Sequence, residues 1–183
     1  NDHWNPPPSI SRIPDVMNNL LGLHISTTQV PGAIRLPLQS VDLISFLPML
    51  TSLYVRQFAV VEAAEVAFGP GLTVVSGETG AGKSLLVDAL MLLAGARADS
   101  GMVRAGSDRA ELAAEFDLAE LPEARQWLLR EELDEDGSCQ LRRVIRTEGS
   151  SKAWINGRPA NARQLGELAS LLVEIHGQHE HQA

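Results

Sequence analysis

The sequence predicts an α/β fold, and three observations support this class. Strand-length apolar runs alternate along the chain with three runs of helical length. A glycine-rich turn, residues 77–82, joins a short apolar run to a longer one. Hydrophobic residues make up 44% and charged residues 21% of the 183 residues, an ordinary balance for a globular chain. This composition excludes a fully disordered, collagen-like or low-complexity chain.

The composition changes abruptly near residue 48. Residues 1–48 hold seven of the ten prolines and only five charged residues, with no lysine and no glutamate. We therefore predict that residues 1–48 form a poorly structured extension, which need not be native, and that residues 49–183 form the globular part. Met49 is a candidate initiator. The alternative is that residues 1–48 form a small ordered cap.

The globular part opens with strand patterns on one side of the glycine-rich turn. Residues 50–61, 65–68 and 72–75 are short apolar runs that predict strands, the third of them buried. Residues 84–94 are apolar on nearly every side and predict a buried helix, with Gly95 as its C-terminal cap. The turn therefore lies between a strand and a helix.

Further strands and helices are predicted along the second half of the chain. Residues 148–151 join two strands in a hairpin, Asn156 and Gly157 mark a further turn, and Asn161 is placed to cap a helix. The predicted strands are residues 110–118, 140–147, 153–156 and 171–175, and the predicted helices are residues 122–133 and 161–170.

Residues 77–84 carry the clearest chemical signal. They match the pattern G-x-x-x-x-G-K-[ST], as Gly77, Glu78, Thr79, Gly80, Ala81, Gly82, Lys83 and Ser84. Glycines let backbone N–H groups curl around phosphate oxygens, and the first turn of the following helix adds N–H donors and a positive dipole end. Lys83 can reach the β- and γ-phosphates of a nucleotide, and Ser84 can coordinate Mg²⁺. We therefore predict nucleotide binding by these residues.

The phosphate loop alone does not select a class of nucleotide enzyme. A GTPase would need an Asn-Lys-x-Asp motif, and neither Lys83 nor Lys152 follows an asparagine. A small-molecule kinase would need an arginine-bearing lid, for which Arg142, Arg143 and Arg146 are candidates on a predicted strand. The strands before the loop and the hairpin after it favour an ATPase head of the ABC type.

Several motifs also carry a resemblance to a known family. They are residues 71–84, 88–90, 95–98, 104–112, 155–159 and 172–182. These stretches resemble the RecN family of bacterial DNA-repair ATPases, and the resemblance covers residues 49–183 almost without a gap. One departure is Gln57, where the family leads us to expect asparagine.

The resemblance implies a P-loop NTPase of the ABC/SMC head type, as an N-terminal lobe with a mixed sheet and an antiparallel β-subdomain. In such proteins a long antiparallel coiled coil separates two lobes, and the second lobe carries the Walker B acid and the signature loop. The resemblance implies ATP and Mg²⁺ as cofactors, ATP hydrolysis by the full-length protein and an ATP-dependent homodimer. We expect the chain to end before the coiled coil and to be inactive alone.

The same resemblance implies a role and a site residue. The role is recombinational repair of double-strand breaks, with DNA ends or single strands as partners, in a nucleoid-associated cytoplasmic location. Gln178 becomes the glutamine-loop residue, whose amide can join the Mg²⁺ shell and bond the attacking water. Lys83 and Gln178 are then the catalytic candidates, and Ser84 and Gln178 the Mg²⁺ ligands. Two alternatives are a head of another SMC- or RecF-type ATPase and a nucleotide-binding interaction module that does not hydrolyse ATP.

Two clusters allow other interpretations. His176, His179 and His181 could bind zinc, although closely spaced histidines more often lie in a solvated turn. A basic concentration could form a DNA-facing stripe or a solvated face paired with Glu131, Glu132 and Asp134. Strand alternation places Arg142 and Arg146 on one face and Arg143 on the other. The basic residues are Arg142, Arg143, Arg146, Lys152, Arg158 and Arg163, and Trp127 and Trp154 are predicted to be packing residues.

Charge and cysteine content bound the remaining possibilities. The net charge of −8 and the pI near 5.1 mean that DNA contact must be local rather than a bulk attraction. The single cysteine, Cys139, excludes an internal disulfide and fits a reducing compartment. No apolar run reaches the length that spans a bilayer, and the first residues show no basic lead before an apolar core. We therefore expect no secretory signal, and a cytoplasmic protein without membrane partners.

Overall fold

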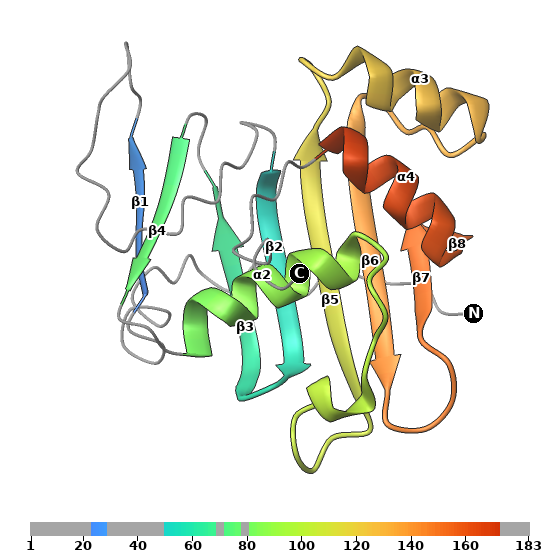
Figure 1. The fold of residues 1–183 in the computed structure, drawn as a ribbon. Coiled ribbons are helices and arrows are strands. Elements are labelled where there is room, and N and C mark those ends of the chain that lie inside the picture. Colours follow the sequence, from blue (N-terminus) through green and yellow to red (C-terminus); the bar gives the residue numbers. More distant parts are fainter. Residues whose placement is uncertain (1–22, 29–49, 69–71, 78–80, 173–183) are drawn as a thin grey trace, which may run out of the picture.

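The computed structural model describes residues 23–28, 50–68, 72–77 and 81–172 (Figure 1). The strands are β1 (Leu23–Thr28), β2 (Leu50–Phe58), β3 (Val61–Ala67), β4 (Leu72–Gly77), β5 (Arg109–Asp117), β6 (Ser138–Arg146), β7 (Lys152–Ile155) and β8 (Arg158–Ala160). The helices are α2 (Ala81–Leu93), α3 (Pro122–Arg130), α4 (Ala162–Leu172) and the short 3₁₀ helix η1 (Ser100–Met102). No helix in these ranges is long and apolar enough to cross a membrane.

Most strands form one antiparallel sheet. Its six strands lie in the order β3-β2-β5-β6-β7-β8, and β1 pairs with β4 in a separate two-stranded sheet. The antiparallel β-subdomain and the hairpin of β6 and β7 are therefore confirmed. Every strand pair among the described residues is antiparallel, so the parallel pairing of a mixed sheet is not seen there.

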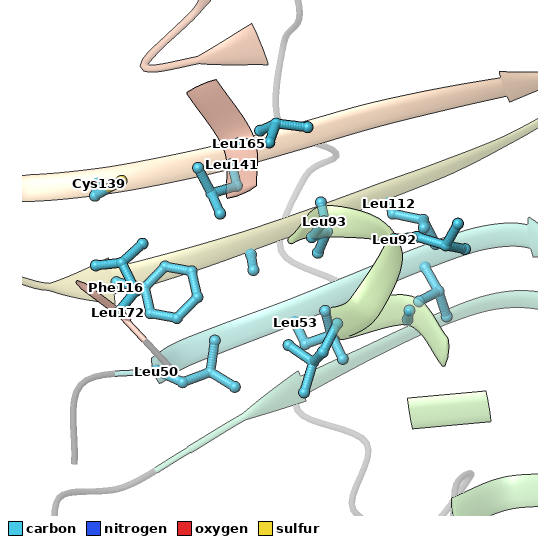
Figure 2. Packing of buried hydrophobic residues seen from close by; sticks show 14 of the residues in the cluster. Leu50, Leu53, Leu92, Leu93, Leu112, Phe116, Cys139, Leu141, Leu165 and Leu172 are labelled. Atoms are coloured by element: carbon cyan, nitrogen blue, oxygen red, sulfur yellow. The ribbon is translucent and has the colours of Figure 1, made fainter. Parts of the chain in front are cut away.

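The helices α2 and α4 cover one face of the six-stranded sheet (Figure 1). The strands alternate in burial, as β5 does with buried Leu112 and Ala114 on the covered side and exposed Glu115 on the other. The core lies between the helices and this face, and Figure 2 shows its leucines pointing toward one another. Its labelled members include Leu53, Leu92, Leu93, Leu112, Phe116, Leu141 and Leu165.

Several predicted elements differ from the structure. The predicted strand 50–61 is two strands, because the chain turns at Ala59 and Val60, where Ala59 has φ +50°. The predicted strand 171–175 is wrong at its start, since Leu171 and Leu172 end α4, and residues 173–175 lie outside the described ranges. The short strand β8 was not predicted; its pairing with β7 across the Asn156–Gly157 turn makes it a strand.

The predicted poorly structured extension contains one strand. The residues of β1 pair with β4 from Leu23 opposite Gly77 to Thr28 opposite Leu72, so the expectation does not hold for these six residues. The rest of residues 1–48 lies outside the described ranges.

Asn156 joins two hairpins through both its backbone and its side chain. Asn156 and Gly157 have φ of +47° and +73°, the left-handed conformations of a tight two-residue hairpin turn. The Asn156 Oδ1 accepts a hydrogen bond from the Gln140 backbone N–H at 2.8 Å, and its Nδ2 donates to the Leu133 carbonyl at 2.8 Å. The predicted turn is therefore also an anchor for β6.

We predict that Asn156→Ala lowers the free energy of unfolding by about 2 kcal/mol, because two side-chain hydrogen bonds are lost and alanine is strained at positive φ. Chemical denaturation measures this loss. Asn156→Gly is the matched control, which removes the same bonds without the strain and should lose less. Equal stability of the alanine variant and the unaltered chain would contradict the anchoring role.

We also predict that a chain beginning at Met49 keeps its melting temperature within a few degrees, because the core residues that the structure describes all lie within residues 50–172. Thermal unfolding of both chains tests this. A larger loss would mean that the pairing of β1 with β4, or another part of residues 1–48, supports the core.

Candidate functional site

The predicted phosphate loop lies between a strand and a helix, as its chemistry requires. The strand β4 ends at Gly77 and α2 begins at Ala81. Residues 78–80 lie outside the described ranges. Lys83 and Ser84 belong to the first turn of α2, and their side chains lie outside what the structure describes. The context of the motif is therefore present, and the roles of its side chains stay predictions.

The N-terminal end of α2 is suited to an anion. The first backbone N–H groups of a helix have no partner within the helix and lie at its positive dipole end. The first turn of α2 contains no acidic residue that could occupy these donors or repel a phosphate. Lys83 and Ser84 in this turn are a cation and a hydroxyl, the residue types that fit a phosphate group and its Mg²⁺.

The C-terminal end of α2 closes with the predicted glycine cap. The Gly95 N–H donates to the Leu92 carbonyl at 3.1 Å, and the Ala96 N–H donates to the Met91 carbonyl at 3.0 Å. Gly95 has φ +92°, and a Cβ there would lie 2.6 Å from the Ala162 carbonyl oxygen of α4. This pair of bonds is the Schellman motif, and only glycine fits between the two helices.

A buried arginine from β6 holds the same end of α2. The Arg143 side chain is only 5% exposed, and its Nη1 donates to the carbonyl oxygens of Leu92 and Ala96. Its Nη2 donates to Ser151 Oγ at 3.2 Å. Burial lowers the pKa of Arg143, but an arginine pKa begins so high that the group stays charged at neutral pH. The sheet therefore places a cation at the negative end of the helix dipole.

The six basic residues do not form one stripe, so that interpretation is wrong. Arg142 lies on the sheet face opposite α2 and α4, which is called the uncovered face below. There it pairs with Glu111, and its guanidinium carbon lies 4.6 Å from the centre of the Trp154 ring. Arg163 pairs with Glu167 on α4 at 2.6 Å. The predicted alternation is confirmed, because Arg143 is buried on the covered face. Arg146, Lys152 and Arg158 are exposed.

Glu111 was not among the predicted acidic partners, since it lies on β5, directly beside β6 but 31 residues earlier in the chain. The packing role predicted for Trp127 is confirmed, whereas Trp154 is half-buried and contacts the Arg142 guanidinium. Trp127 is buried in α3 and its indole N–H donates to Glu167 Oε2 at 3.4 Å.

Gln57 fastens the end of β2 to the loop that follows η1. Gln57 has φ +50°, a region that asparagine adopts more readily than most residues, which accounts for the asparagine expected here. Its Oε1 accepts a hydrogen bond from Ser107 Oγ at 2.9 Å, and its carbonyl accepts one from the Arg104 N–H at 2.8 Å. Sequence reasoning noted the residue but missed these contacts, because their partners lie about 50 residues away in the chain.

A cavity of about 600 Å³ where β5 ends and β6 begins does not suit phosphate. Carboxylates of Glu115, Asp117, Glu135 and Asp136 line it, and no lysine or arginine does. Cys139 also lines it, and burial raises the pKa of its thiol to about 12, so the thiol stays protonated and unreactive. This cavity therefore does not compete with the loop before α2.

The structure adds no metal-binding candidate to those predicted from the sequence, as far as its described residues go. Among the described residues, no group of three or more histidines, cysteines or acids is arranged to hold a metal ion. The cluster of His176, His179 and His181 and the predicted Mg²⁺ ligand Gln178 lie outside the described ranges.

Comparison with solved structures supports the fold. An SMC ATPase, from work on ATP-driven dimerization and DNA-stimulated activation of these proteins, aligns with a TM-score of 0.55 at 22% identity. The match covers 68% of this chain and 80% of that one. The Smc head domain of Pyrococcus yayanosii aligns with a TM-score of 0.52 at 20% identity, over 69% of this chain and 26% of its own. The predicted head-type fold is confirmed.

Comparison with known sequences gives the family. A family model described as an AAA domain matches residues 52–158. The DNA repair protein RecN of Xylella fastidiosa (strain Temecula1) is 61% identical over 134 residues, which are 73% of this chain and 24% of the relative. RecN of Vibrio cholerae is 46% identical over 134 residues, with the same coverage. The chain thus spans about a quarter of the length of these relatives. The chain belongs to the AAA domain family, and over 73% of its length its sequence is similar to RecN proteins.

Proposed function

We propose that this chain is the ATP-binding part of a RecN-type protein that acts in the recombinational repair of DNA double-strand breaks. The observation that carries the proposal is the complete phosphate-loop sequence, residues 77–84, between β4 and α2. It occurs in a domain that is 61% identical to a protein named for DNA repair.

The residues of the loop divide the work of holding the triphosphate. Backbone N–H groups of residues 77–82 and of the first turn of α2 donate to phosphate oxygens. Lys83 neutralises charge on the β- and γ-phosphates, and the Ser84 hydroxyl holds Mg²⁺ together with the amide of Gln178. When bound, Mg²⁺ neutralises part of the phosphate charge that grows during transfer.

The reaction of the full-length protein is hydrolysis of the β–γ phosphoanhydride of ATP. Little covalent work falls to the protein in such a transfer, so positioning and charge neutralisation supply most of the catalysis. Gln178 orients the attacking water, and a carboxylate from a second lobe polarises it. The division of the site between two lobes makes the present chain a binding unit rather than a complete enzyme.

The proposed partners are supported by the solved SMC ATPase structure with a similar fold. The SMC ATPase with the similar fold is described by ATP-driven dimerization and DNA-stimulated activation. We propose that two heads of this protein likewise dimerise around ATP. We also propose that a coiled coil and a second lobe complete each head, and that DNA ends or single strands bind the assembly. The location is the cytoplasm, in association with the nucleoid.

We predict that two substitutions in the full-length protein separate binding from turnover. Lys83→Ala removes a charge contact to phosphate and should weaken ATP binding at least tenfold, whereas Gln178→Ala should cost about 1 kcal/mol of binding or less. Gln178→Ala should instead lower turnover about tenfold or more, since only the geometry of bond breaking changes. Titration with ATP and steady-state turnover measure the two effects.

Lys152→Ala is the matched control for these substitutions, because Lys152 is an exposed lysine on β7. It should bind and turn over ATP like the unaltered protein. Unchanged ATP binding in Lys83→Ala would contradict the proposed site. Unchanged turnover in Gln178→Ala would contradict only the role of the amide.

We predict further that residues 1–183 alone bind ATP–Mg²⁺ weakly and hydrolyse it at the background rate, because the catalytic acid is proposed to lie in the second lobe. Phosphate release by the purified chain measures this. Turnover that Lys83→Ala abolishes would mean that the chain carries its own catalytic acid.

A further inference from the structure

We propose that Arg143 is a positioning residue of the nucleotide site, which holds the C-terminal end of α2 and thereby fixes where the N-terminal end presents the phosphate loop. The inference rests on the proposed ATP binding by residues 77–84. It concerns a side chain that touches neither the phosphate loop nor any residue assigned to it.

The helix α2 connects the phosphate loop at its N-terminal end directly with the Arg143 contact at its C-terminal end. Its 13 residues span about 20 Å at 1.5 Å per residue, with the predicted loop at Ala81 and the arginine contact at Leu92. A helix of this length is stiff, so a shift or rotation at one end moves the other. The position of the first N–H donors therefore depends on how the last turn is held.

The last turn of α2 supplies no cation of its own. It contains no basic residue, although the carbonyl groups at a helix end are left without helical partners and carry the negative end of the dipole. Gly95 and Ala96 satisfy two carbonyls through their N–H groups. Arg143 reaches across from β6 and donates to the carbonyl oxygens of Leu92 and Ala96.

Packing alone does not account for an arginine at this position. The neighbours of Arg143 on the covered face of β6 are Leu141 and Ile145, which are 1% and 2% exposed. A third apolar side chain would fill the space without the cost of burying a guanidinium. The guanidinium instead makes the contact directional, because its planar N–H donors form good hydrogen bonds with carbonyl oxygens only in a narrow range of positions. The apolar contacts between the α2 leucines and the sheet have no preferred direction, whereas these hydrogen bonds do.

A second contact limits the same end of the helix from the other side. A Cβ on Gly95 would overlap the Ala162 carbonyl of α4, and a Cβ on Gly166 would lie 3.6 Å from the Ala94 carbonyl. The end of α2 is thus confined between β6 and α4. Arg143 contributes the hydrogen bonds from the β6 side, to Leu92 in α2 and to Ala96 just after it.

The test uses the full-length protein with Arg143→Met, Arg143→Lys and the control Arg142→Met. Arg142 is the adjacent arginine on the opposite face, so its loss removes the Glu111 and Trp154 contacts without touching α2. ATP affinity is measured without DNA, well below each melting temperature. Amide hydrogen exchange at residues 81–85 is measured without nucleotide.

We expect Arg143→Met to weaken ATP binding about tenfold and to speed exchange at residues 81–85, because the loop loses its fixed position. Arg143→Lys, which keeps the charge but not the planar fork, should lie between Met and the unaltered protein. Arg142→Met should stay within about twofold of the unaltered affinity, whatever its melting temperature.

Several outcomes would overturn the proposal. One is a folded Arg143→Met variant with a lower melting temperature but unaltered ATP affinity and exchange, which would make Arg143 only a stabilising residue. If Arg143→Met does not fold, Arg143→Lys decides: a folded variant with weaker binding and faster exchange supports the proposal, and one with unaltered values overturns it. If the unaltered protein does not bind ATP, the proposed function fails, and the exchange measurement alone still decides whether Arg143 positions α2.

Discussion

The packing of α2 against the six-stranded sheet is the interaction on which the rest of the structure depends. Five leucines of this helix are buried: Leu85, Leu86, Leu90, Leu92 and Leu93. At about 2 kcal/mol for each buried leucine, they supply on the order of 10 kcal/mol toward folding. The hydrogen bonds from Arg143 contribute far less net energy, because a guanidinium must be removed from water to make them. Apolar burial thus decides that α2 binds the sheet, and the polar bonds decide where.

The same division between energy and geometry recurs at the ends of the strands. Gln57 and Asn156 both have positive φ and both use their side chains to reach another segment. Neither contributes much apolar area to the core, and each ties a strand end to another segment of the chain. Gln57 ties the end of β2 to the loop of Arg104 and Ser107, and Asn156 ties the turn between β7 and β8 to Leu133 and Gln140. Polar side chains therefore fix the positions of the loop and the turn at these strand ends.

The uncovered face of the sheet has a different character from the covered one. Arg142 is held by Glu111 and by the ring of Trp154, so its charge is partly neutralised within the fold. The exposed Arg146 and Lys152 lie on neighbouring strands in a protein whose net charge is −8. A chain with this net charge repels a polyanion at long range, so the DNA contact proposed above has to be local. Screening by salt at cellular ionic strength leaves short-range contacts as the effective ones.

Features written in neighbouring residues could be predicted from the sequence. The phosphate loop at residues 77–84, the cap at Gly95, the Asn156–Gly157 turn and the start of α4 after Asn161 each depend on a few adjacent residues, and their context in the structure agrees. Strand alternation also predicted that Arg142 and Arg143 face opposite ways. It could not tell which face is covered, because the covering helix lies about 50 residues earlier in the chain. The turn at Ala59, the strand β8, the pairing of Arg142 with Glu111 and the burial of Arg143 depend on partners brought together only by folding. The sequence by itself determined the phosphate-loop pattern and its place between a strand and a helix; the tertiary structure decided how the far end of that helix is held, because a buried charge persists only where distant carbonyl groups converge on it.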